Sequence, residues 1–144
     1  MKIQNAILIT YMNILGLYAD KKLPQKICYA ITKNILLIEN ELAAYQKSLS
    51  KIIEKYNDYI EKDENDETIL LPIGVPQVDD KHKDDYIREI NELLSIEVDV
   101  NLYKIDENNF DYVDSERYDI LSAKDIITLR NILCEGVEDE EVNR

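Results

Sequence analysis

The fold is decided by residues 31 to 59, which read ITKNILLIENELAAYQKSLSKIIEKYNDY. Apolar or tyrosine side chains recur in this stretch at alternating spacings of four and three, at Ile31, Ile35, Ile38, Leu42, Tyr45, Leu49, Ile52, Tyr56 and Tyr59. An unbroken heptad pattern of this kind is typical of a long helix with one apolar seam that packs against other helices. No Gly or Pro interrupts residues 25 to 61. The sequence therefore predicts one helix over Pro24 to Glu61, about 57 Å long.

A shorter helix is predicted upstream of this stretch. Its apolar and tyrosine side chains are spaced by three and four and share one helix face; they are Ile3, Ile7, Tyr11, Ile14, Leu15 and Tyr18. The sequence Lys21-Lys22-Leu23-Pro24 separates the two helices, because proline is well accommodated in the first turn of a new helix. At about 25 Å, the first helix covers less than half of the second. The rest of the seam needs either a third helix that folds back or a second copy of the chain.

The segment that follows the long helix contains a weak strand signal and a third helix. Residues 68 to 75 have the composition of an edge strand that Pro72 interrupts. Asp84 and Asp85 are suited to start a helix, since carboxylates accept hydrogen bonds from the first free amides. The apolar side chains of this helix are Ile87, Ile90, Leu93 and Leu94.

Two further elements are predicted towards the carboxyl terminus. Residues 96 to 102 alternate apolar and polar side chains, which predicts a half-buried strand. A last helix is predicted over Ala123 to Cys134, because Ser122 and Asp125 have the spacing of a capping box.

Acidic side chains are concentrated in the second half of the chain. Residues 1 to 60 hold eight Lys and five Asp or Glu, a net charge of +3, whereas residues 61 to 144 hold nine Lys or Arg and 25 Asp or Glu, a net charge of −16. We expect a mainly α fold of the α+β kind. A helical hairpin or coiled-coil arm is predicted over residues 1–61, followed by an acidic module over residues 62–144 with two or three short strands and two helices. The length of 144 residues is typical of one structural unit.

The formal net charge of −13 argues against direct binding of nucleic acid, because each neutralised phosphate needs a cationic partner. It favours a basic protein as partner, since carboxylates attract Lys and Arg, and tyrosine is enriched in binding surfaces. The side chains predicted for this partner-binding surface are Asp63, Glu64, Asp66, Glu67, Asp79, Asp80, Asp84, Asp85, Asp111, Tyr112 and Asp114. The heptad seam is the alternative contact surface, for a second copy in a homodimer.

No pattern of catalytic or metal-binding residues stands out. His82 is the only histidine and lies among four aspartates between residues 79 and 85, but two interleaved lysines favour a solvated loop over a metal site. Acidic and amide side chains recur at alternate positions between residues 106 and 114, as in a calcium loop. However, Asp111 replaces the required Gly and Arg117 the required Glu. We therefore expect no cofactor and no enzymatic activity.

The cysteines and the apolar amino-terminal run favour a cytoplasmic protein. Cys28 and Cys134 are over a hundred residues apart and have no CxxC spacing, which predicts two reduced, core-packed thiols. The apolar run from Ala6 to Tyr18 is shorter than the about 20 residues that cross a bilayer. It is predicted to be part of the first helix and not a membrane segment or a secretion signal.

The stretch KLPQKICYAITKN at residues 22–34 leads directly into the long predicted helix. Together with IENEL at residues 38–42 and INELLSIEV at residues 90–98, it resembles a family of small uncharacterised phage and prophage proteins. In that family a "KLP…YAI.KN" sequence precedes a long helix, and LSAKD at residues 121–125 fits the same pattern. The resemblance implies viral origin, a small accessory role and a location in the host cytoplasm. It supplies no catalytic residues.

Three functions follow as hypotheses. The first is a non-enzymatic interaction protein that presents its acidic face to a basic groove of a host nucleic-acid-handling or defence machine, in the manner of an anti-CRISPR protein. The second is an accessory of virion or tail assembly that oligomerises through the heptad seam. The third is a carboxylate- or metal-dependent enzyme, for which no residue pattern selects an active site. We prefer the first hypothesis.

Overall fold

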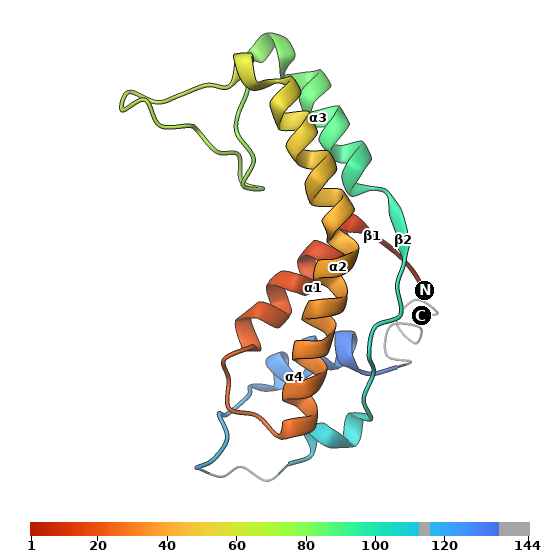
Figure 1. Ribbon diagram of the computed structural model, residues 1–144. Coiled ribbons are helices and arrows are strands. Elements are labelled where there is room, and N and C mark those ends of the chain that lie inside the picture. The colour runs from red at the N-terminus through yellow and green to blue at the C-terminus, as the bar shows by residue number, and fades with distance from the viewer. Residues whose placement is uncertain (113–115, 136–144) are drawn as a thin grey trace.

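The computed structural model of the protein describes residues 1–112 and 116–135 (Figure 1). Within these residues the chain is mainly helical, as the sequence predicts, and has one small antiparallel sheet of two strands. The elements in chain order are β1 (Lys2–Gln4), α1 (Asn5–Tyr18), α2 (Gln25–Lys55), the 3-10 helix η1 (Asn57–Tyr59), α3 (Asp80–Leu94), β2 (Glu97–Asp99), the 3-10 helix η2 (Glu107–Phe110) and α4 (Ala123–Leu133).

Helix α2 is the axis of the molecule, and the other helices are arranged along it (Figure 1). α1 lies against the amino-terminal half of α2, and α3 lies against its carboxyl-terminal half. The distal part of the seam is therefore covered by the third helix of the same chain, which is one of the two arrangements that the sequence left open.

The predicted extent of the long helix, from Pro24 to Glu61, is wrong at both ends. Pro24 is the N-cap of α2 and does not lie within its first turn. The helix ends at Lys55, because Tyr56 leaves the helical conformation with φ −101° and ψ 14°. The 3-10 helix η1 then contains Asn57 and Asp58, whose short polar side chains compete with regular helix formation.

The seam side chains divide between two hydrophobic clusters. The first cluster contains Ile31, Ile35, Ile38, Leu42 and Tyr45, and the second contains Leu49, Ile52 and Tyr56. Tyr59 lies beyond the end of α2 and stacks on the ring of His82. The first cluster also includes Ile3, Val100, Phe110 and Leu129, so residues from both sides of the predicted boundary at 61/62 pack in it.

The chain begins with a strand where a helix was predicted. Residues 2–4 form β1, which pairs antiparallel with β2 and places Ile3 opposite Val98. α1 starts only at Asn5, whose backbone N–H donates to the carbonyl of Ile96 at 3.0 Å. The predicted apolar face is also partly wrong, because Ile7 is exposed while Leu8 is buried. The strand partner lies about a hundred residues away, and helical periodicity does not reveal it.

Two predictions for the distal segment need correction. Residues 68–75 form no strand; the chain makes isolated bridges there, such as Leu70 with Pro76. Helix α3 does not start at Asp84 and Asp85 but at Asp80, because the Asp79 side chain is its N-cap. The Asp79 carboxylate accepts a hydrogen bond from the backbone N–H of His82 at 3.1 Å, which satisfies one of the first free amides.

The last helix is confirmed, together with its capping box. The Ser122 hydroxyl accepts from the Asp125 N–H, and the Asp125 carboxylate accepts from the Ser122 N–H, both at 3.1 Å. The Tyr18 hydroxyl also donates to Asp125 at 2.6 Å, and this hydrogen bond raises the pKa of Tyr18 to about 12. The start of α4 is thereby joined to the end of α1. Cys134 follows the helix and is buried, and neither it nor Cys28 forms a disulfide.

The chain after β2 runs extended beside α2 and is held there by a buried amide (Figure 1). Only Glu97–Asp99 of the predicted strand at 96–102 pair in the sheet. Further along, Asn34 of α2 is fully buried, and its Nδ2 donates to the carbonyl of Tyr103 at 2.8 Å. The N–H of Tyr103 donates to Asn34 Oδ1 at 2.6 Å. One amide side chain thus pairs with both backbone groups of a residue 69 positions away.

Candidate protein-interaction surface

The structure separates the predicted partner-binding residues into two groups at opposite ends of α2 (Figure 1). The distal group lies between η1 and the first turns of α3 and comprises Asp63, Glu64, Asp66, Glu67, Asp79, Asp80, Asp84 and Asp85. Asp111 and Tyr112 lie beside η2, and the side chain of Tyr112 packs on the first hydrophobic cluster. Asp114 is outside the described residues. The candidate surface is therefore the distal group alone.

The acidic loop, defined as residues 61–79, is folded back on itself by a ring of backbone hydrogen bonds. Glu61 N–H donates to the carbonyl of Gln77, Gln77 N–H to that of Ile69, and Ile69 N–H to that of Glu61, at 2.9, 2.8 and 3.1 Å. Each of the three residues therefore donates to one of the other two and accepts from the third. The segments are joined by isolated bridges and not by continuous strand pairing. The Gln77 side chain adds a hydrogen bond to the Glu61 carboxylate at 3.0 Å.

The tip of the acidic loop is a turn built around Asp63. Its carboxylate accepts hydrogen bonds from the backbone N–H groups of Asn65 and Glu67, at 2.9 and 3.0 Å. Asp66 has a φ of 62°, a left-handed conformation that Asp adopts more easily than most residues. Asp63 thus shapes the turn, while Glu64 and Glu67 are exposed on it.

Buried side chains fix the other end of the loop to α3. Val75 and Val78 belong to the second hydrophobic cluster, together with Tyr86 of α3. The Tyr86 side chain is only 1 % exposed, and its hydroxyl donates to the carbonyl of Pro76 at 2.7 Å. The loop is therefore an ordered part of the distal cluster.

The start of α3 is tied to η1 by an aromatic stack. The His82 ring lies parallel to the ring of Tyr59, with 3.5 Å between their centroids. Its Nδ1 lies 2.7 Å from the Asp79 carboxylate, and this hydrogen bond lowers the pKa of Asp79. Among the described residues, no three His, Cys, Asp or Glu side chains are grouped as a metal ion requires. His82 and Asp79 have a structural role here.

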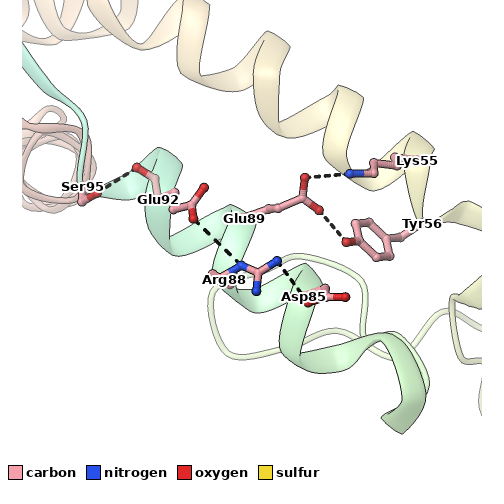
Figure 2. A network of polar contacts seen from close by, with 7 residues as sticks. All are labelled: Lys55, Tyr56, Asp85, Arg88, Glu89, Glu92 and Ser95. Atoms are coloured by element: carbon pink, nitrogen blue, oxygen red, sulfur yellow. Dashed lines mark hydrogen bonds and ion pairs between the residues drawn. The ribbon is translucent and has the colours of Figure 1, made fainter.

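A polar network joins α3 to the end of α2. Figure 2 shows Glu89 directed at α2, where its carboxylate accepts from Lys55 Nζ at 2.9 Å and from the Tyr56 hydroxyl at 2.5 Å. These two hydrogen bonds lower the pKa of Glu89, and the one with Glu89 raises the pKa of Tyr56 to about 12. At neutral pH Glu89 is therefore ionised and Tyr56 protonated. Because Glu89 belongs to α3 and Lys55 and Tyr56 to the end of α2, this network holds the two helices together.

We expect replacement of Glu89 by Gln to lower the free energy of unfolding by about 1 kcal/mol at pH 7, because two hydrogen bonds lose their charged acceptor. The folded-state pKa of Glu89 lies below its usual value of 4.5. Its contribution to stability is therefore complete above that pH and is lost as the pH falls through the folded-state pKa. Urea denaturation of both proteins between pH 7 and pH 3 measures this difference.

Glu92→Gln is the matched control on the same helix. Glu92 is exposed, and its ion pair with Arg88 is long, at 4.0 Å, so we expect a change below about 0.5 kcal/mol. A loss in Glu89→Gln that does not depend on pH would contradict the role of the Glu89 charge.

The outer face of α3 has a different charge pattern. Arg88 lies between Asp85 and Glu92, at 3.1 and 4.0 Å (Figure 2). It borders a shallow surface hollow of about 580 Å³ between residues 83 and 95. Asp80 and Asp84 are exposed and make no ion pair within the described part of the chain. Lys81 and Lys83 are exposed on the same helix, and Lys83 lines the same hollow, so the face carries charges of both signs with a small acidic excess.

The sequence did not identify several residues on which this surface depends. Tyr86 was missed, although it is spaced by four and seven from Ile90 and Leu93 and could have been found as part of the apolar face of α3. The exposure of Leu70 and Ile73 was also missed, because residues 68–75 were interpreted as a strand. No periodic pattern distinguishes an exposed from a buried apolar residue in an irregular loop.

No family model, curated protein or solved structure matches the chain. The resemblance to small phage and prophage proteins therefore stays a prediction from the residues quoted above. Among the described residues, no helix combines the length and the apolar composition needed to cross a membrane.

Proposed function

We propose that this protein is a non-enzymatic interaction protein whose acidic loop and outer α3 face bind a basic surface of a protein partner. The observation that carries the proposal is the group of exposed carboxylates at the distal end of α2. Within the described residues, Glu64, Glu67, Asp80 and Asp84 form no ion pair with Lys or Arg. Their charges are available to a partner, because binding a Lys or Arg of that partner would break no ion pair within this protein.

The local charge supports association with a basic protein. Residues 61 to 95 hold eleven Asp or Glu and four Lys or Arg, a net charge of −7. A field of this sign attracts a cationic surface over about 8 Å at physiological ionic strength and raises the rate of encounter. Salt is therefore expected to weaken binding.

We further propose that the partner is a host protein that handles nucleic acid, such as a defence nuclease. The basic groove of such a protein is built for phosphates, and carboxylates on an ordered loop and helix can occupy it instead. The phage resemblance supports this class of partner, because inhibition of host defence is an accessory role. The interaction would block access of nucleic acid without any chemical step.

The second hypothesis, assembly through the heptad seam, was motivated by a part of the seam that the first helix could not cover. Eight of the nine seam side chains lie in the two hydrophobic clusters of the same chain. Since these side chains already pack within one chain, we place the assembly hypothesis second.

The test compares two variants with the same change in net charge. The distal variant carries Glu64→Gln, Glu67→Gln and Asp84→Asn, and the control variant carries Asp20→Asn, Glu39→Gln and Glu97→Gln. Each protein is immobilised and exposed to a bacterial lysate at low salt. Retained proteins are identified by mass spectrometry, purified and titrated against each variant.

We expect basic nucleic-acid-binding proteins to be retained, and the distal variant to bind them about tenfold more weakly than the control variant. The difference should shrink at high salt, and the bound partner should lose affinity for its nucleic acid. Equal affinity of the two variants, or retention that salt does not change, would contradict the proposal.

A further inference from the structure

The outward face of α2 has a shallow apolar hollow in its amino-terminal half. Its volume is about 410 Å³, and the residues that line it are Tyr29, Thr32, Lys33, Leu36, Leu37 and Asn40. Two of these side chains are large, apolar and accessible, since Tyr29 is 50 % exposed and Leu36 61 %. From its first to its last residue the hollow extends for about 16 Å along the helix, which is three helical turns.

A second aromatic ring beside this α2 hollow is held in place. The ring of Tyr103 contacts the ring of Tyr29 edge-to-face, with 5.4 Å between the centroids. The backbone of Tyr103 is fixed by its two hydrogen bonds with Asn34. Lys33 Nζ lies 5.8 Å from the Tyr29 centroid and 5.5 Å from the Tyr103 centroid, where a cation is attracted to an aromatic ring. A partner does not have to order these groups, which removes a usual cost of association.

The charge in the α2 hollow is positive. Lys33 is the one charged residue that lines it, and Lys33 forms no ion pair within the described part of the chain. Residues 100–105, which include Tyr103, contain no Asp or Glu. The carboxylates of this part of α2 belong to Glu39 and Glu41, which helical geometry places about 90° or more around the helix from the centre of the hollow.

This charge determines what can cover the hollow. A partner that covers it removes water from the Lys33 ammonium group, and burying a charge is costly unless a counter-charge is supplied. The protein itself supplies none among the lining residues. The complementary surface therefore combines apolar side chains with at least one carboxylate.

The backbone of α2 determines the form of the partner segment. Residues 29 to 40 lie in the interior of the helix, so their backbone N–H and carbonyl groups are paired within it. An extended peptide would find no backbone partner on this face. A second helix pairs its own backbone groups and can pack along α2 through apolar side chains spaced by three and four.

We propose that the α2 hollow binds an acidic amphipathic helix of a partner protein. Leu36 and Leu37 contact the apolar side chains of that helix, and Lys33 pairs with one of its carboxylates. The inference goes beyond the proposed function, because it assigns a second surface whose charge is opposite to that of the distal group. The protein then has two separate contact surfaces, one for a basic and one for an acidic partner.

The test uses three synthetic peptides of about 20 residues, a length at which helices begin to form in water. The first is an amphipathic helix with Leu at positions spaced by three and four and with Glu and Ala elsewhere. The second has the same composition in an order that scatters Leu around the helix, and the third has Lys in place of Glu. Each is titrated into the full chain at physiological ionic strength, where charges act over about 8 Å, and binding is mapped by amide chemical shifts.

We expect the first peptide to bind about tenfold more tightly than the second and to shift amides of residues 29–40. The third peptide should leave these amides unchanged, because its Lys side chains repel Lys33. Under the proposed function the third peptide shifts amides of residues 61–95 instead. The two surfaces are thus tested separately. Absence of binding by the first peptide, or equal binding of the first and second, would overturn the α2 hollow and leave the distal surface untouched.

Two variants with matched substitutions locate the contact. The hollow variant carries Lys33→Gln and Leu36→Ser, and the control variant carries Lys124→Gln on α4 and Leu17→Ser on α1. All four side chains are exposed, so we expect both variants to keep the fold. The hollow variant should bind the first peptide about tenfold more weakly than the control variant. Equal affinity of the two variants for this peptide would place the contact elsewhere and refute the proposal.

Discussion

Replacing Asn34 with Ala is expected to lower the free energy of unfolding by about 2 to 4 kcal/mol, measured by urea denaturation. Asn34 is fully buried, and its amide pairs with both the N–H and the carbonyl of Tyr103. Alanine removes both hydrogen bonds and leaves the two backbone groups without their partners, which costs more than the bonds themselves contribute. The extended chain beside α2 should loosen in consequence.

Asn40→Ala is the matched control for this prediction. Asn40 lies on the exposed face of the same helix, so the same substitution there changes stability by less than about 0.5 kcal/mol. Hydrogen exchange gives a second reading, because the amide of Tyr103 should exchange faster in Asn34→Ala than in Asn40→Ala. Similar stability of the two variants would show that the Asn34 amide does not hold this segment.

Asn34 also shows which contacts the apolar heptad pattern does not predict. The heptad pattern identified Ile31, Ile35 and Ile38 as packing residues, and these lie in the first hydrophobic cluster. Asn34 is three residues after Ile31 and four before Ile38, so it lies on the same face of α2. It was missed because the pattern was built from apolar and tyrosine side chains alone. Its partners are the backbone N–H and carbonyl of Tyr103. A contact with backbone groups does not depend on the side chain of the partner residue, so the sequence pattern does not reveal it.

Predictions from local signals were accurate where the cause is itself local. The capping box of Ser122 and Asp125 needs only residues within one turn, and it was predicted correctly. β1 depends on β2, from which it is separated by about a hundred residues, and it was missed. The α3 start was misplaced for a related reason, since Asp79, Asp84 and Asp85 are equally good caps by sequence.

The candidate surface was predicted in part. Glu64 and Glu67 are exposed at the distal end, as their charge indicates. However, composition gives the amount of charge and not its position. Asp111 was assigned to the same surface, although it follows η2, whose Phe110 packs in the first hydrophobic cluster. Only the packing of the clusters along α2 separates the two groups.

The largest loss of stability is expected from Tyr86→Ala, about 3 to 5 kcal/mol. Tyr86 is 1 % exposed, contacts the Tyr56 ring edge-to-face at 5.1 Å and donates to the carbonyl of Pro76. Its removal leaves a cavity where α2, α3 and the acidic loop meet. Hydrogen exchange should therefore accelerate first in α3, while the amides of α4, which lies in the other cluster, stay protected.

Tyr86→Phe is the control that separates packing from hydrogen bonding. It keeps the ring in the second hydrophobic cluster and removes only the hydroxyl, so we expect a loss of about 1 kcal/mol. If Tyr86→Ala cost no more than Tyr86→Phe, the ring would not be the centre of the distal cluster. If exchange accelerated equally in α3 and α4, the two clusters would unfold as one. The proposed interaction surface requires a large loss of stability in Tyr86→Ala. The acidic loop can present its charges in a fixed arrangement only while the Tyr86 ring holds the loop to α3.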